Sequence, residues 1–80
     1  MKEFDIMSVF EEMAWIDSLK ADNEEVIITI YTYYDGHYTV SFEDCYNIPE
    51  DKIIQISYYS EYKKFDYSDI SDLVIDCREK

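Results

Sequence analysis

The single histidine and the two cysteines are the residues of this chain best suited to nucleophilic chemistry. A cysteine becomes an effective nucleophile when a histidine lies within hydrogen-bond reach of its thiol. His37 and Cys45 are close in sequence, but in the extended strand expected here they would lie roughly 26 Å apart. That distance excludes contact within the strand, and an exposed polar residue beside a turn is the ordinary role for His37.

Motifs for metals, phosphates and disulfide scaffolds are also missing. Cys45 and Cys77 form no CxxC pair, and we expect two reduced thiols that behave as small apolar residues. They could bridge only if the fold brought their Cα atoms within about 7 Å. With one glycine in the chain there is no glycine-rich phosphate loop, and no EF-hand loop is present. We therefore expect no enzymatic activity, no metal and no cofactor.

Negative charge is the most informative property of the composition. Nineteen acidic residues against seven basic ones give a net charge of −12, above the magnitude of about 2–8 that suffices for solubility in a small domain. Such a surplus repels itself in the folded state, so we expect a basic protein surface as partner. Direct binding of nucleic acid is disfavoured because the field has the wrong sign. A high-salt cytoplasm or drift in an acidic proteome are the plain alternatives.

Acidic residues recur at spacings that could form a binding surface. On a predicted final helix, Asp69, Asp72 and Asp76 would line one face at intervals of ~5–6 Å, similar to the separation of neighbouring phosphates. Any one such cluster is typical of a solvated helix face. The predicted partner-binding residues comprise this set, a second acidic patch and three tyrosines as docking contacts: Asp69, Asp72, Asp76, Glu43, Asp44, Glu50, Asp51, Tyr31, Tyr33 and Tyr59.

A β-hairpin over residues 25–43 is the element that must position these groups. Two runs of β-branched and aromatic residues flank Asp35-Gly36, a strong hairpin signal. A two-residue turn would leave Val26, Ile28 and Ile30 opposite polar residues. A three-residue loop, Tyr34 to Gly36 with Gly36 left-handed, instead gives one wholly apolar face, and we predict this register. That face holds Val26, Ile28, Ile30, Tyr38, Val40 and Phe42, while Thr29, Tyr31, Tyr33, His37, Thr39, Ser41 and Glu43 point outward.

An amphipathic helix is predicted from Phe4 to Lys20, capped by Asp5 or Ser8. Trp15 lies opposite its apolar stripe; we expect Trp15 to cover the edge of a small sheet, and the alternative is an exposed interface anchor. The stripe comprises Ile6, Val9, Phe10, Met13 and Ile16.

After the hairpin we predict a loop, a strand and a second helix. The loop spans Asp44 to Asp51, and alternation from Lys52 to Tyr62 predicts a third strand antiparallel to the second. Residues 66–80 have helical spacing with Ser68 as N-cap, although a fourth strand beginning at Leu73 would also fit. The expected fold is α+β: one three-stranded antiparallel sheet with an N-terminal and a C-terminal helix, in the order α-β-β-β-α, as a single domain over residues 1–80.

Two further features of the sequence indicate the cellular location of the protein. No apolar run approaches the ~20 residues that a membrane helix needs. The N-terminus, MKEFDIMS, has acids where a signal peptide has a basic region before an apolar core. We expect a cytoplasmic protein.

The leading helix, the YDGHYTVSFED hairpin, the third strand and the acidic end together resemble an anti-CRISPR inhibitor of Cas9. Such inhibitors belong to a class of small acidic phage proteins that occupy the DNA-binding sites of host enzymes. The resemblance implies action in the cytoplasm of a bacterial host, no cofactor, and a basic DNA-binding or PAM-binding groove as target. An immunity protein or antitoxin against a basic nuclease toxin fits the same electrostatics. A homodimeric regulatory subunit, paired through its tyrosines or a sheet edge, is a third interpretation.

Overall fold

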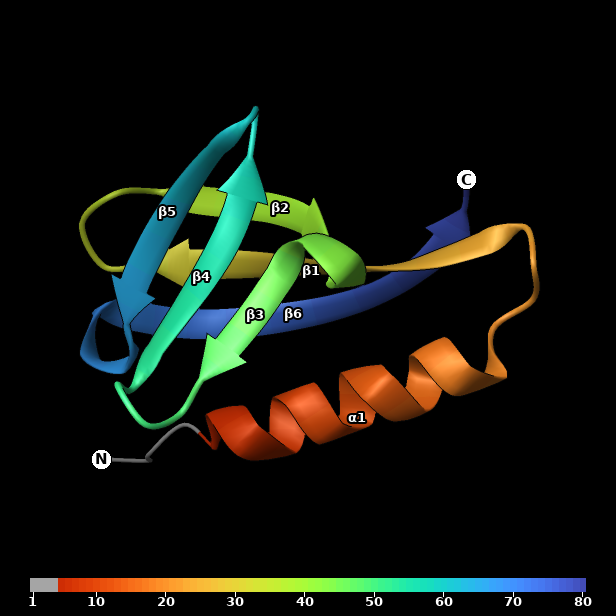
Figure 1. The fold of residues 1–80 in the computed structure, drawn as a ribbon, viewed down its shortest axis with the longest axis horizontal. Coiled ribbons are helices and arrows are strands. Elements are labelled where there is room, and N and C mark those ends of the chain that lie inside the picture. Colours follow the sequence, from red (N-terminus) through yellow and green to blue (C-terminus); the bar gives the residue numbers. More distant parts are fainter. Residues whose placement is uncertain (1–4) are drawn as a thin grey trace.

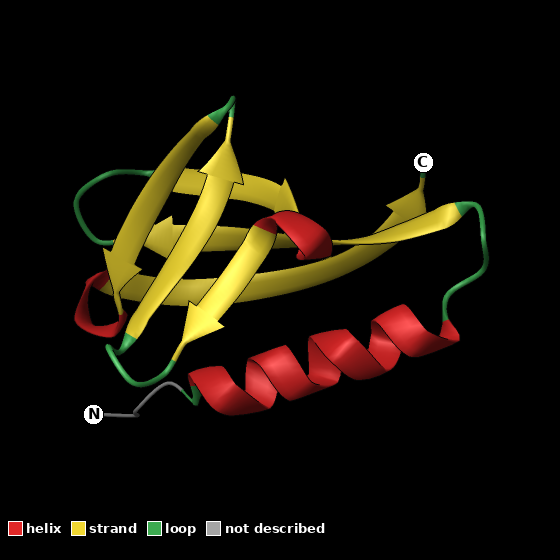
Figure 2. Ribbon diagram, viewed as in Figure 1, coloured by secondary structure: helices red, strands yellow, loops and turns green. Residues whose placement is uncertain are grey.

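The computed structural model describes residues 5–80, which contain one α-helix and six strands (Figures 1 and 2). In chain order they are α1 (Ile6–Leu19), β1 (Glu24–Thr32), β2 (His37–Ser41), β3 (Cys45–Ile48), β4 (Ile53–Tyr58), β5 (Glu61–Asp66) and β6 (Ile70–Glu79). Two short 3₁₀ turns, η1 (Phe42–Asp44) and η2 (Tyr67–Asp69), precede β3 and β6.

The strands form two three-stranded antiparallel sheets, ordered β2-β1-β6 and β3-β4-β5. Figure 1 shows one sheet in front of the other, with their strands crossing steeply and α1 running along one side of the pair. The chain leaves the first sheet through η1 and returns to it through η2. The α+β class is therefore confirmed, but the predicted single sheet is wrong.

The core lies between the two sheets and α1. Ile28 and Ile30 from the first sheet, Ile54 and Ile56 from the second, and Met13 from the helix are all 0% exposed. No buried residue among those described is polar or charged. Burial of aliphatic side chains from three elements is what holds these layers together, since each layer has only one apolar side.

The N-terminal helix matches its prediction in position and apolar stripe. Asp5 is the N-cap, accepting a hydrogen bond from the Ser8 backbone N–H at 3.2 Å and from the Ser8 hydroxyl at 2.7 Å. The predicted first residue, Phe4, lies outside the described residues. Trp15 is 65% exposed, so the expectation that it covers a sheet edge is wrong. Leu19, one turn further along, is equally exposed.

In the central hairpin the predicted faces are correct and the loop is longer. Ile28 pairs with Val40 and Ile30 with Tyr38, two residues out of register with the predicted three-residue loop. A shift of two keeps every side chain on its predicted face, because strand side chains alternate with a period of two. Thr32 favours the longer loop: its hydroxyl accepts from the Asp35 N–H at 2.9 Å and donates to the Gly36 carbonyl at 2.8 Å. Gly36 has φ 69°, the left-handed conformation predicted for it.

The segment after the hairpin holds more strands than predicted. The loop expected from Asp44 to Asp51 contains β3, and the strand expected from Lys52 to Tyr62 is a hairpin, β4 and β5. Its turn is formed by Tyr59 and Ser60, with φ 48° and 66°. Neither is a usual residue for this conformation, so the turn carries no Gly or Asn signal. β4 pairs with β3 and β5, and its predicted pairing with the second strand is wrong.

The predicted C-terminal helix is also wrong, because β6 is a strand that pairs with β1 from Ile70 to Glu79, with a register shift at Ser71. Ser68, the predicted helix cap, lies in η2. Leu73, Ile75 and Cys77 face the core at two-residue spacing, so the same apolar residues satisfy strand alternation. Pairing with β1 supplies hydrogen bonds to both strands, which an isolated helix in this position would leave unmade on β1.

Candidate protein-binding face

One face of the β2-β1-β6 sheet packs on the core, and the opposite face, called here the outer face, is not covered by another layer. Its residues alternate with the core residues along the strands and share rows across the sheet. Tyr31 and Val74 on this face are 40% and 44% exposed. The outer face comprises Glu25, Ile27, Thr29, Tyr31, His37, Thr39, Ser41, Asp72, Val74, Asp76 and Arg78.

Cross-strand contacts order the centre of the outer face. Tyr31 lies between His37 on β2 and Asp72 on β6, and the Tyr31 and His37 ring centroids are 5.3 Å apart. In the next row the hydroxyls of Thr29 and Thr39 lie 2.9 Å apart. Such neighbours restrict one another's rotamers, so a partner would meet a surface that is already ordered.

Asp72 and Asp76 lie along the margin of this face. The Asp72 carboxylate accepts from the Leu73 backbone N–H at 2.8 Å, and the Asp76 carboxylate accepts from the Cys77 N–H at the same distance. β6 is the edge strand of its sheet, so these N–H groups point away from β1. Each carboxylate therefore caps a donor of the free strand edge and keeps a second oxygen for solvent or a partner.

The predicted regular spacing of the acidic set is wrong. Asp72 and Asp76 share a face, but four residues of strand place them ~13 Å apart, about twice the interval expected on a helix. Asp69 belongs to η2, and its carbonyl accepts from the Tyr33 N–H at 3.0 Å. Tyr33 and Asp69 thus meet at one end of the sheet, next to the row of Tyr31 and Asp72.

The structure places the second predicted patch elsewhere and divides it. Glu43 and Asp44 lie in η1, before β3, whereas Glu50 and Asp51 lie in the turn after it. Tyr59 is at the tip of the β4–β5 hairpin and 86% exposed. Asp44 and Tyr59 line one shallow hollow, which also borders β2. The ten predicted residues therefore form at least two separate surfaces.

Carboxylates in the described part of the chain are largely without cationic neighbours. Among residues 5–80 there is one ion pair, in which the Lys20 Nζ lies 3.8 Å from the Asp17 Oδ1. No cluster of His, Cys, Asp and Glu that could hold a metal occurs in the same range. On the outer face, Arg78 lies opposite Glu25 and in the row next to Asp76, but it forms no ion pair with either carboxylate. The charge near Asp72 and Asp76 is thus available to a cationic partner.

The histidine and cysteine do not form a nucleophilic site. His37 is exposed on the outer face, whereas Cys45 is buried in the other sheet. Burial raises the pKa of the Cys45 thiol to about 12, so its nucleophilic thiolate form is disfavoured. Cys77 is half-buried, and both thiols are free.

Comparison with protein-family models, with curated proteins and with solved structures finds no match for this chain. Its function is therefore inferred from its own residues. Among residues 5–80, no helix is both long enough and apolar enough to cross a membrane.

Sequence reasoning missed the apolar part of the outer face. Ile27 points to this face yet is only 7% exposed, and Val74 lies in the adjacent row. The uninterrupted run Val26-Ile27-Ile28 was the available signal, because a continuous apolar run indicates a central strand with both faces in apolar surroundings.

Proposed function

We propose that this protein is a small acidic inhibitor that uses its outer face to occupy a basic, nucleic-acid-binding surface of another protein. The target class is a CRISPR effector or another defence enzyme in the cytoplasm of a bacterial host, as in the anti-CRISPR class. The observation that supports this best is the uncovered sheet face on which Tyr31 adjoins Asp72, with Asp76 further along the same strand.

Two physical effects make such a face a competitor for nucleic acid. A net charge of −12 steers the protein toward a cationic groove and raises the association rate. Tyr31 and Val74 then offer partly exposed apolar area of the kind that anchors protein interfaces. A wide spacing between Asp72 and Asp76 favours competition through overall charge and contact area over imitation of each phosphate.

Competition for DNA tests the proposal. A guide-loaded Cas9-type effector is incubated with labelled target DNA, and bound DNA is measured by fluorescence anisotropy as the protein is added. We expect displacement that weakens steeply between about 50 mM and about 200 mM salt. A panel of purified nucleases is treated in the same way.

A pair of matched variants separates the outer face from net charge. Asp72→Asn/Asp76→Asn removes two charges but keeps a side-chain oxygen for the Leu73 and Cys77 N–H groups. Glu50→Gln/Asp51→Asn removes the same charge from the distant β3–β4 turn. We expect the first variant to lose at least about tenfold in inhibition and the second to stay within about threefold. Equal effects of both would refute the outer face as the contact surface.

The rival interpretations give different results in the same assays. An immunity protein would neutralise a basic nuclease toxin and leave CRISPR effectors active. A homodimeric subunit would show twice the chain mass in light scattering and no displacement of DNA.

A further inference from the structure

We infer that a slot along β2, which borders the outer face and shares His37, Thr39 and Ser41 with it, binds an extended basic peptide segment that pairs with the free edge of β2. This inference goes beyond the proposed inhibition, because it concerns the main chain at the edge of β2 and a different shape of partner. Strand addition of this kind draws affinity from backbone hydrogen bonds and selectivity from the side chains around the slot.

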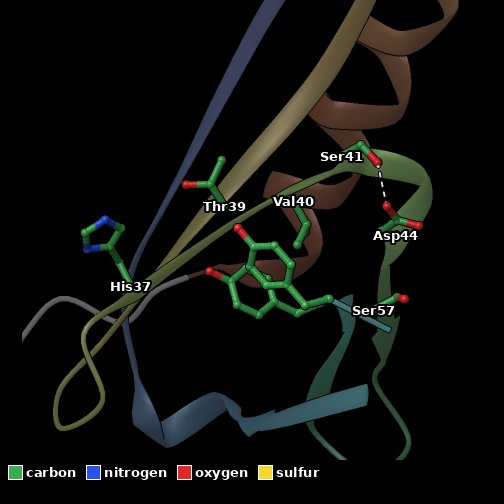
Figure 3. Close-up of a pocket in the computed structure, with 8 residues that line it drawn as sticks. His37, Thr39, Val40, Ser41, Asp44 and Ser57 are labelled. Atoms are coloured by element: carbon green, nitrogen blue, oxygen red, sulfur yellow. Dashed lines mark hydrogen bonds between the residues drawn. The ribbon is translucent and has the colours of Figure 1, made fainter. Parts of the chain in front are cut away.

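The slot is a hollow of about 520 Å³ between β2 and the tip of the β4–β5 hairpin. This volume lies within the range of ligand sites, about 300–1,000 Å³. Figure 3 shows Thr39 and His37 on one side of β2 and Val40 on the other, with Ser57 across the hollow. The lining residues are His37, Thr39, Val40, Ser41, Asp44, Ser57, Tyr58 and Tyr59.

The hydrogen-bonding pattern between β1 and β2 determines which backbone groups of β2 face this slot. Along an antiparallel ladder, residue pairs that exchange hydrogen bonds alternate with pairs that do not. The Thr32 N–H donates to the Gly36 carbonyl at 2.8 Å. Counting every second pair from there, Ile30 with Tyr38 and Ile28 with Val40 are the hydrogen-bonded pairs of the β1–β2 ladder. The intervening residues of β2 direct their N–H and C=O groups away from β1. They are His37, Thr39 and Ser41, three of the residues that line the slot.

The opposite wall of the slot also presents backbone groups. The last pair between β3 and β4 joins Cys45 to Ile56, so Ser57 lies beyond the end of β3. Tyr58 pairs with Glu61 across the two-residue turn, and by the same alternation Ser57 faces away from β5. Its N–H and C=O groups therefore point toward the hollow, where an added segment would meet main-chain partners on both sides.

Of the two edges of this sheet, β2 is the more open to pairing. On β6 the carboxylates of Asp72 and Asp76 cap the outward N–H groups of Leu73 and Cys77 and leave that of Ile75 between them uncapped, which hinders strand addition there. On β2 the nearest polar side chains are engaged elsewhere: Thr39 with the Thr29 hydroxyl, and Ser41 with the Asp44 carboxylate at 3.0 Å. No side chain caps the outward groups of β2 among the described hydrogen bonds.

Charge defines the occupant as basic. Asp44 is the one carboxylate in the lining, and the whole chain has a net charge of −12. The exposed Tyr59 ring at the rim can in addition stack on a Lys or Arg side chain. An extended segment with Lys or Arg at alternate positions would place those side chains on one face, toward Asp44 and Tyr59.

The test uses a defined probe peptide, acetyl-Lys-Val-Lys-Thr-Lys-Val-Lys-amide, titrated into the isotope-labelled full chain and followed by NMR amide shifts. The control peptide has the same sequence with N-methyl groups at alternate residues, which removes the pairing N–H groups and keeps the charge. We expect shifts centred on His37, Thr39, Ser41 and Ser57, and at least about tenfold weaker binding of the methylated peptide. Equal affinity of both peptides, or shifts centred on Asp72 and Asp76, would overturn the inference.

Protein variants give an independent reading. Thr39→Pro removes an outward N–H that β1 does not use, a position where a strand tolerates proline, and should weaken binding at least about tenfold. Thr39→Val removes only the hydroxyl and should bind as wild type does. If Thr39→Pro unfolds the sheet, the comparison of the methylated and unmethylated peptides on the wild-type protein still tests the inference.

The outcome is separable from that of the proposed function. Asp72→Asn/Asp76→Asn should leave peptide affinity within about threefold of wild type, because neither residue lines the slot. Loss of peptide binding in that variant would place the peptide on the outer face and refute the slot. Failure of the slot would leave the DNA competition by the outer face unaffected.

Discussion

The Asp72 carboxylate accepts a hydrogen bond from the backbone N–H of Leu73 at 2.8 Å, and Asp76 repeats this contact with Cys77. These acids thereby serve the fold as well as the surface, since the long edge strand β6 would otherwise present free donors to a second chain. We therefore expect the residues that make the outer face acidic also to hinder pairing of a second chain with β6.

Removing these caps should expose the edge of β6. We expect Asp72→Ala/Asp76→Ala to self-associate at concentrations where the wild type stays monomeric, as measured by light scattering. Asp72→Asn/Asp76→Asn removes the same charge but keeps an acceptor for each N–H and should remain monomeric. Self-association of both variants to the same extent would show that charge repulsion prevents assembly and that capping of the edge N–H groups does not.

The β4–β5 turn should be a site of easy stabilisation. Tyr59 and Ser60 have φ 48° and 66°, a conformation that costs an ordinary residue about 1–2 kcal/mol and suits Asn and Gly. Tyr59→Asn/Ser60→Gly should raise the free energy of unfolding in urea by about 1–2 kcal/mol. As a control, Gly36→Ala should lower it by about 1 kcal/mol. Gly36 has φ 69°, and nothing beyond its chain neighbours lies within 4 Å of the position that a Cβ would occupy, so the loss would come from backbone strain and not from a clash. No gain in the first variant would mean that the turn relaxes at little cost.

The two faces of α1 should respond differently to truncation. Met13 is fully buried, so Met13→Ala should reduce the free energy of unfolding by about 2–5 kcal/mol through lost burial and the resulting cavity. Trp15 is mostly exposed, and Trp15→Ala should change stability by less than about 0.5 kcal/mol. Urea unfolding of both variants measures this difference. A large loss for Trp15→Ala would contradict the observed position of the indole.

Alkaline pH should destabilise the protein through Cys45. Burial raises the pKa of this thiol from 9.0 to about 12, so above pH 9 the unfolded chain releases a proton that the native chain keeps. The stability contribution of the neutral thiol is complete below pH 9 and is lost as the pH rises toward 12. Unfolding free energies from pH 8 to pH 11 should therefore fall more steeply for the wild type than for Cys45→Ala.

Alkylation provides a second measurement of the burial of the Cys45 thiol. Iodoacetamide at pH 8 should modify Cys77 before Cys45, because Cys77 is only half-buried. Rapid modification of Cys45 in the native protein would contradict its burial.

Local sequence patterns predicted the elements whose signals are complete within a few residues. The Asp5 cap and the apolar stripe from Ile6 to Ile16 specified α1, and Asp35-Gly36 specified the hairpin with its faces. The loop length was wrong because the Thr32 hydroxyl competes for the turn. The β4–β5 turn was missed because Tyr59 and Ser60 carry no turn signal.

Sequence reasoning named three residues of the outer face, Tyr31, Asp72 and Asp76, without their arrangement. Tyr31 was expected on a strand and the two aspartates on a helix, whereas all three lie on one face of a sheet. The spacing of Ile70, Leu73, Val74 and Cys77 fits a helix, and Leu73, Ile75 and Cys77 fit a strand equally well. Local propensity could not choose between the two.

What the sequence by itself determined is a protein with strong net negative charge, an amphipathic first helix and a hairpin with one apolar face, because these depend on composition and short-range periodicity. The tertiary structure alone decided that residues 70–79 form a strand. β1 has two edges, and β6 satisfies the second with backbone pairing between residues that are 38 (Thr32 and Ile70) to 55 (Glu24 and Glu79) positions apart in the sequence. That pairing also places Asp72 beside Tyr31 and creates the outer face.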